Sequence, residues 1–194
     1  MEAMIVRAFG ESIEAKRAFF NEANVEAITK AATLVSDAFK AGGKLMIVGN
    51  GGSAADAQHL VAEFVNRFQI ERPPLPALAL TTDSSVITSI GNDYDYSLIF
   101  SKQVKALGKE GDVLLAISTS GNSTNVIEAV VAAKALGIKT ITMTGGDGGA
   151  LAKQADIALN VEVAVTARVQ EVHITIGHII CELVDYILFE QVPV

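Results

Sequence analysis

Short apolar runs alternate along this chain with longer segments in which apolar residues recur every three or four positions. An unbroken apolar run of five or six residues is typical of a strand buried on both faces, whereas the three-to-four spacing is typical of a helix. Strands joined by helices in this way form a parallel sheet that is covered on both sides. The sequence therefore predicts an α/β fold with a five-stranded parallel sheet flanked by helices on both faces. The expected strands are 44–49, 76–80, 112–118, 139–145 and 156–161, and the helical segments between them are 53–68, 84–107 and 123–137.

Helical patterns also flank the predicted sheet. Two helices precede the first strand within residues 1–43, and a long, unusually apolar helix is expected over about 167–189. The proline-rich stretch 71–76 forbids a helix and reads as a loop inside one domain. A chain of 194 residues with half of them apolar can build one sizeable core. We expect residues 1–194 to form a single domain whose first 43 residues contribute to an oligomer interface.

The net charge limits the possible partners of the chain, and the cysteine content limits its disulfides. The net charge of −7 disfavours nucleic acid and anionic membranes, because both attract clustered Lys and Arg. The single cysteine, Cys181, excludes an internal disulfide and lies in an apolar run typical of a core thiol. We found no leader-like N-terminal pattern and no run of about eighteen apolar residues. These observations predict a cytoplasmic protein without a nucleic-acid or membrane partner.

Hydroxyl-bearing and glycine residues follow the expected strands. In an open parallel sheet, ligands bind beyond the carboxyl ends of the strands. The segment after the third strand, STSGNS, offers four hydroxyls, a glycine for a tight turn and the free N–H groups of a following helix, which together suit a phosphate. The same residue types also serve as ordinary turn and cap residues. The hydroxyls belong to Ser118, Thr119, Ser120 and Ser123.

His59 and Glu63 lie four residues apart, which places them on one face of the expected helical segment 53–68. A histidine and a carboxylate at this spacing suit zinc or another divalent ion, but further ligands must come from elsewhere. On the last helix, Gln170 and His178 point about 80° apart, whereas His173 points away from His178 by about 140°. Without a third ligand, His59 and Glu63 would be a solvated pair and His178 a core histidine.

The order of these motifs resembles the phosphoheptose isomerase family of sugar isomerase (SIS) domain proteins over nearly the whole chain. The broader SIS class is marked by GNGGS and STSGNS, and the heptose isomerases by the HxxxE pair and by a Gln and a His eight residues apart. The resemblance implies a single SIS domain, a homotetramer with sites built between subunits, and a zinc ion. It is carried by GNGGS (49–53), HxxxE (59–63), IGND (90–93), ISTSGNS (117–123), TGGDGG (144–149) and RVQEVH (168–173) followed by His178.

The resemblance also implies roles for individual residues. The four STSGNS hydroxyls would hold the phosphate of the substrate, and the zinc ligands would be His59, Glu63, Gln170 and His178. The rest of a phosphorylated seven-carbon sugar would contact Asn50, Gly51, Gly52, Ser53, Arg67, Asn92, Asp93 and Gln170. One position departs from the pattern, because Ala167 occupies a place where many members have an Asp.

The expected reaction is an aldose–ketose isomerisation through an enediol(ate), which interconverts sedoheptulose 7-phosphate and D-glycero-D-manno-heptose 7-phosphate. In the family, this is the first step towards ADP-heptose and the heptose of bacterial lipopolysaccharide. Moving a carbonyl between neighbouring carbons needs a base and an acid, and Glu63 and His178 are the candidates. A divalent ion would polarise the carbonyl.

Two alternatives share the same frame. One is a non-enzymatic SIS adaptor that binds the bacterial replication initiator, and the other is an SIS isomerase for another phosphosugar. An adaptor has no reason to keep Glu63, Gln170, His178 and all four loop hydroxyls, so the sequence favours an isomerase. The sugar anomer, the metal and the subunit origin of each site residue stay open.

Overall fold

The computed structural model describes residues 1–190 and has one five-stranded sheet in the order β2-β1-β3-β4-β5, with every neighbouring pair parallel. This confirms the predicted fold class, and each strand lies within two residues of its expected place. Residues 191–194 of the expected domain lie outside the described part. The strands are β1 Leu45–Gly49, β2 Ala77–Ala79, β3 Val113–Ser118, β4 Lys139–Gly145 and β5 Ile157–Val161.

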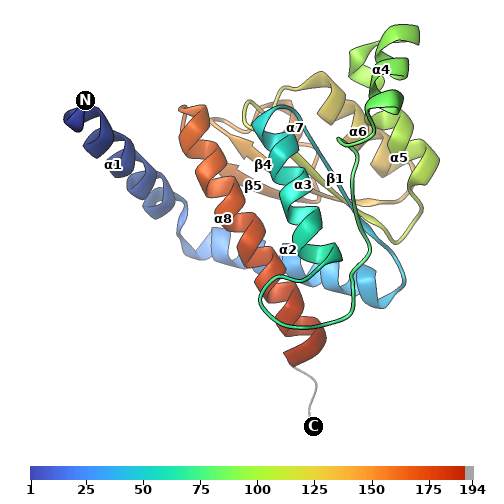
Figure 1. Ribbon diagram of the computed structural model, residues 1–194, viewed down its shortest axis with the longest axis horizontal. Helices are drawn as coiled ribbons and strands as arrows, with labels where there is room; N and C mark the ends of the chain where they lie inside the picture. Colours follow the sequence, from blue (N-terminus) through green and yellow to red (C-terminus); the bar gives the residue numbers. More distant parts are fainter. Residues whose placement is uncertain (191–194) are drawn as a thin grey trace.

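Side chains on successive strand residues point to two separate cores, as the pleat requires. In β1, Leu45 and Ile47 join a core with α1, α2, α3 and α8, while Met46 and Val48 join a second core with α4–α7. Figure 1 shows α3 and α8 crossing one face of the sheet and α5 and α6 behind it. The helices are α1 Glu2–Phe19, α2 Glu22–Lys40, α3 Gly52–Val65, α4 Ser84–Asp93, α5 Ser101–Leu107, α6 Thr124–Ala135, α7 Gly149–Ala152 and α8 Thr166–Asp185.

The segment 84–107 differs from the expected continuous helix. It is divided into α4, a 3₁₀ turn at Tyr96–Leu98 (η1) and α5. The Asp95 carboxylate accepts a hydrogen bond from the Ser97 N–H, and such a local bond competes with the helical pattern. The break allows Ile99 and Phe100 to enter the second core, where both are buried.

The last helix is apolar on several sides, as the sequence indicates. α8 ends at Asp185 and continues as a π-helical turn at Tyr186–Glu190 (η2). Thr166–Glu190 is long and apolar enough to cross a membrane, but the core helices of soluble proteins often have the same length and composition. Here α8 packs against α1, α2 and α3, and burial raises the pKa of the Cys181 thiol on it. We therefore interpret α8 as a core helix, and Cys181 is the buried thiol that the sequence predicts.

Helices α3 and α8 run in the same direction with a close contact in the middle. A Cβ added at Gly177 would lie 2.5 Å from Cδ2 of Leu60, which is itself buried. Closer to the start of both helices, a Cβ at Gly52 would lie 2.4 Å from Nε2 of Gln170. Glycine at these two positions allows the helices to approach one another, and this approach sets the spacing of the side chains between them.

Replacing Gly177 with Val should lower the free energy of unfolding by about 1–3 kcal/mol, because the added carbons overpack the contact with Leu60. Urea denaturation measures the change. The matched control is Gly10→Ala in α1, where an added Cβ would meet no atom of the described residues within 4 Å. The free energy of unfolding of that variant should rise by about 0.5–1 kcal/mol, because Ala has a higher helix propensity than Gly. A Gly177→Val protein as stable as wild type would contradict the tight contact.

Candidate functional site

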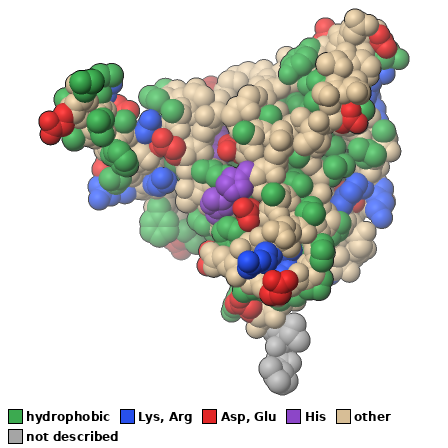
Figure 2. All heavy atoms as spheres, viewed as in Figure 1, with side chains coloured by type: hydrophobic (Ala, Val, Ile, Leu, Met, Phe, Trp, Pro, Cys, Tyr) green, Lys and Arg blue, Asp and Glu red, His purple; other side chains and the backbone are tan. Residues whose placement is uncertain are grey.

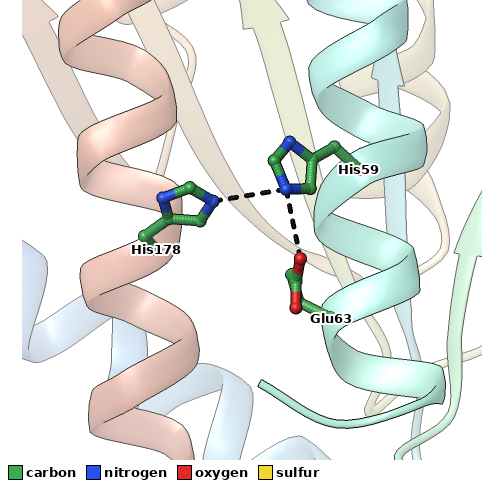
Figure 3. A group of neighbouring side chains, drawn as sticks. All are labelled: His59, Glu63 and His178. Atoms are coloured by element: carbon green, nitrogen blue, oxygen red, sulfur yellow. Dashed lines mark hydrogen bonds and ion pairs between the residues drawn. The ribbon is translucent and has the colours of Figure 1, made fainter. Parts of the chain in front are cut away.

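Two histidines and a glutamate meet between α3 and α8. Nε2 of His59 lies 3.1 Å from Oε1 of Glu63 on the same helix and 3.4 Å from Nε2 of His178 on the other. Figure 3 shows the His178 ring extending from α8 towards the two α3 side chains. One donor atom from each of the three residues lies within 4.8 Å of the others. The structure thus places together three of the four residues expected to bind a metal.

Two imidazoles and a carboxylate match the ligand preference of zinc. Two histidine nitrogens close together gain no hydrogen bond when both are unprotonated, whereas both can donate a lone pair to one cation. The group is accessible, since the His59 side chain is 47% exposed and that of Glu63 is 22% exposed. Figure 2 shows the histidines at the molecular surface next to an acidic side chain. The donor set therefore fits a divalent metal that can also contact a ligand from solution.

Gln170, the fourth expected ligand, lies two turns before His178 on the same helix. Its amide lies against Gly52, at the start of α3. The Gln170 side chain is thus placed on the line of contact between α3 and α8, next to the loop that follows β1. Ala167, the position that departs from the family pattern, is exposed in the first turn of α8.

The hydroxyl loop follows β3, as the sequence predicts. The hydroxyl of Ser118 lies 2.9 Å from that of Ser123 and 3.4 Å from that of Ser120, while Thr119 is half-buried beside them. Gly121 has φ 64°, a value that favours glycine, and it turns the chain into α6. Three hydroxyls therefore converge at the start of a helix, an arrangement suited to an anion.

The TGGDGG segment packs against this loop. A Cβ at Gly149 would lie 2.6 Å from the carbonyl carbon of Gly121, so only glycine allows the two loops to touch. The Asn122 side chain also accepts a hydrogen bond from the N–H of Ala150. The glycine-rich segment after β4 thus supports the hydroxyl loop from behind.

An asparagine pair joins the loop after β1 to the first turn of α6, just after the hydroxyl loop. Asn50 and Asn125 exchange two side-chain hydrogen bonds of 2.8 and 2.9 Å, and the Tyr96 hydroxyl lies 3.4 Å from Oδ1 of Asn50. Asn125 is buried, so its amide holds Asn50 in place. Gly51 and Gly52 are exposed next to Asn50, and Ser53 is buried in the first turn of α3.

Three expected sugar contacts lie outside these clusters. Asn92 and Asp93 end α4, are exposed, and hydrogen-bond to each other. Arg67 follows the end of α3, is exposed, and forms an ion pair with Glu71. Among residues 1–190, no side-chain hydrogen bond or ion pair joins these three residues to His59, Glu63 or His178.

Sequence reasoning did not identify Asp56 or Phe68 as part of the site. Burial raises the pKa of the Asp56 carboxyl, while the charges of His59 and His178 act to lower it. Among residues 1–190, Oδ2 of Asp56 is buried without a hydrogen-bond partner. The Phe68 ring stacks on His178 with 5.4 Å between centroids. Asp56 could have been predicted from the sequence, because it lies three residues before His59 and therefore on a neighbouring part of the same helix face. The contact of Phe68 could not, because Phe68 lies in the loop after α3.

His173 points away from the site, as the helical wheel predicts. It is fully buried, and its Nε2 lies 3.0 Å from the carbonyl oxygen of Thr144 at the end of β4. Burial lowers the pKa of His173 from 6.5 to about 4, and the contact with Thr144 acts in the opposite direction. A neutral imidazole that donates to this carbonyl fixes α8 to the sheet.

Comparisons with known proteins identify the family of this chain. The SIS domain family model matches residues 8–145. A phosphoheptose isomerase from Thermodesulfovibrio yellowstonii is 53% identical over 98% of this chain and 94% of its own length. One from Nitratidesulfovibrio vulgaris strain Hildenborough is 56% identical over 94% of this chain and 87% of its own length. The chain belongs to the phosphoheptose isomerase family of SIS-domain enzymes.

The solved structure of a phosphoheptose isomerase from Neisseria gonorrhoeae superimposes with a TM-score of 0.90 at 47% identity, and covers 95% of this chain and 98% of that one. Such agreement over nearly full length extends to the helices that carry the site, not only to the sheet. Membership of the phosphoheptose isomerase family, expected from the order of the motifs, is therefore confirmed.

The stability of the fold should depend on pH through His173. Because its folded pKa of about 4 lies below the ordinary 6.5, the contribution of the neutral ring is complete above pH 6.5 and is lost as the pH falls towards 4. Between pH 6.5 and 4, the free energy of unfolding of wild type should fall by roughly 3 kcal/mol more than that of His173→Gln. The glutamine keeps a donor for Thr144 but does not titrate. Chemical denaturation at several pH values measures both proteins. Parallel pH curves for the two proteins would show that His173 is not buried in its neutral form.

Proposed function

We propose that this enzyme converts sedoheptulose 7-phosphate to D-glycero-D-manno-heptose 7-phosphate through an enediol(ate), as an early step towards the ADP-heptose of bacterial surface polysaccharide. The observation that carries this proposal is the group of His59, Glu63 and His178 between α3 and α8. Two of its members lie on α3, which begins at the loop after β1, and in that loop Asn50 is hydrogen-bonded to Asn125, just after the hydroxyl loop. Relatives that are named phosphoheptose isomerases support the choice of a heptose phosphate.

The metal in this proposal is zinc, which His59, Glu63, Gln170 and His178 would hold. The two imidazoles and the carboxylate already lie within reach of one ion. When bound, such an ion acts as a Lewis acid towards the sugar oxygens.

The proton transfers fall to residues of the chain. The Glu63 carboxylate takes a proton from C1 of the ketose and returns it to C2, so that the carbonyl moves from C2 to C1. His178 gives a proton to O2 as the enediol forms, and takes the O1 proton as the aldehyde forms. Nε2 of His59 lies 3.1 Å from Oε1 of Glu63, so the carboxylate is already turned towards the rest of the ligand group.

The hydroxyl loop holds the phosphate at the far end of the substrate. Ser118, Thr119, Ser120 and Ser123 surround the anion, and the sugar chain extends past Asn50, Gly51, Gly52 and Ser53 towards Gln170. Asn92, Asp93 and Arg67 would contribute if a neighbouring subunit brought them to the site. Binding energy from the phosphate then orients the reacting carbons. The reaction takes place in the cytoplasm, where phosphorylated sugars are made.

Purified protein with added zinc should convert sedoheptulose 7-phosphate to the aldose, and Glu63→Gln should reduce turnover by at least ~10²-fold, the typical contribution of a positioned base. NMR of the sugar follows the conversion. The amide has nearly the same shape as the carboxylate but cannot accept the proton.

The control is Glu110→Gln, which removes an exposed carboxylate before β3, at the opposite end of that strand from the hydroxyl loop, and should leave turnover unchanged. Near-normal turnover in folded Glu63→Gln would remove Glu63 as the base. No conversion by folded, zinc-loaded wild type would instead favour another phosphosugar or the adaptor that binds the replication initiator.

The proposal includes a homotetramer, to which residues 1–43 contribute. Figure 1 shows α1 extending away from the rest of the chain, and Figure 2 shows hydrophobic side chains along it. Ile5, Val6 and Phe9 are 59%, 67% and 70% exposed, and only Ala15 and Phe19 of α1 are buried within the chain. Covering such a row of large apolar side chains with other copies would remove it from water.

Phe9→Glu should therefore shift the sedimentation equilibrium mass from that of four chains to smaller species, because a carboxylate cannot enter an apolar interface without cost. The control is Glu11→Gln, a neutral change on the same helix. A monomeric wild type would contradict the tetramer.

A further inference from the structure

Arg72 is a buried arginine in the loop between α3 and β2, and its guanidinium is hydrogen-bonded on every nitrogen. Its side chain is 1% exposed. Nη2 donates to the Glu63 carbonyl at 2.8 Å, and Nη1 donates to the Phe64 carbonyl at 2.6 Å and to that of Asn66 at 3.3 Å. These carbonyls belong to the last turn and the C-cap of α3, where a cation is favourable because of the helix dipole.

Arg72 also has a side-chain partner on α8. Nε donates to Oδ1 of Asp185 at 2.9 Å, and the Asp185 side chain is 5% exposed. Asp185 lies seven residues after His178, which places the two on nearly the same face of α8. Arg72 therefore joins the end of α3 to the end of α8 on the side that carries the histidine.

This connection lies next to the candidate metal ligands. The backbone carbonyl of Glu63, whose carboxylate is one of the donor atoms, is itself bound by Arg72. Next to the two histidines in the sequence, the contact between Leu60 and Gly177 fixes the distance between the same two helices. The donors on α3 and α8 are thus held by a tight steric contact beside them and a buried ionic contact at the helix ends.

We propose that Arg72 and Asp185 are positioning residues that set the metal affinity of the site by fixing α3 against α8. The inference rests on the proposed metal site, and it assigns a role to two residues that touch neither metal nor substrate. Arg suits this role because its planar group presents five N–H donors in fixed directions, which a lysine cannot match.

Arg72→Lys keeps the charge but loses most of the hydrogen bonds to α3. Asp185→Asn is milder, because it removes the charge and keeps an acceptor for Nε. Zinc affinity of the folded full-length proteins is measured by competition with a chromophoric chelator at 25 °C, next to thermal unfolding. Both variants should bind zinc about 10-fold or more weakly than wild type, a typical loss when a residue that supports a metal ligand is changed.

The matched control is Lys44→Met, which breaks the partly buried ion pair between Lys44 and Asp112. This pair joins the residues before β1 and β3, so its loss should lower stability and change zinc affinity by less than twofold. The inference is overturned if both Arg72→Lys and Asp185→Asn bind zinc as tightly as wild type, or if Lys44→Met loses as much affinity as they do. If wild type itself binds no zinc, the proposed metal site fails and this inference fails with it, an outcome distinct from equal binding by all proteins.

Discussion

The packing of α3 against α8 is the contact on which the candidate site depends. Two helices that are far apart in the sequence run in parallel, with Gly177 allowing Leu60 to approach closely. A side chain at Gly177, or at Gly52 near the start of α3, would push the two helices apart, so these glycines decide how near the helices come. The distance between His59 on one helix and His178 on the other follows from that approach.

The loop after β1 connects the two halves of the site. Asn50 is fixed by Asn125 at the start of α6, and Gly52 touches Gln170 on α8. The loop after β1 therefore links the hydroxyl cluster, which suits a phosphate, to the donor group, which suits a metal. In an isomerase for a long phosphosugar, phosphate binding and the reaction need separate places, since the phosphate and the reacting carbons lie at opposite ends of the substrate.

Two histidines of α8 differ in burial, and this difference decides what each side chain can do. His173 and His178 are five residues apart on α8, yet the first is sealed against the sheet and the second faces α3 with partial exposure. Desolvation keeps His173 neutral, so it serves as a hydrogen-bond donor to the backbone. His178 lies near two other potential ligands and stays accessible to solvent.

The sequence alone determined the order of the elements and the faces of the helices. Five apolar runs gave the five parallel strands, and the helical spacing of His59 and Glu63, and of Gln170 and His178, predicted which side chains point the same way. These features are local, because side-chain direction follows from the period of a helix or strand. The family also followed from the order of the motifs.

Only the tertiary structure decided what meets across elements. It divided 84–107 into two helices, because the local bond of Asp95 and the burial of Ile99 and Phe100 outweigh the helical pattern. It also brought His178 to His59, Asn125 to Asn50 and Arg72 to Asp185. These contacts join residues far apart in the chain, and their distances depend on the packing of whole helices, which no local pattern contains.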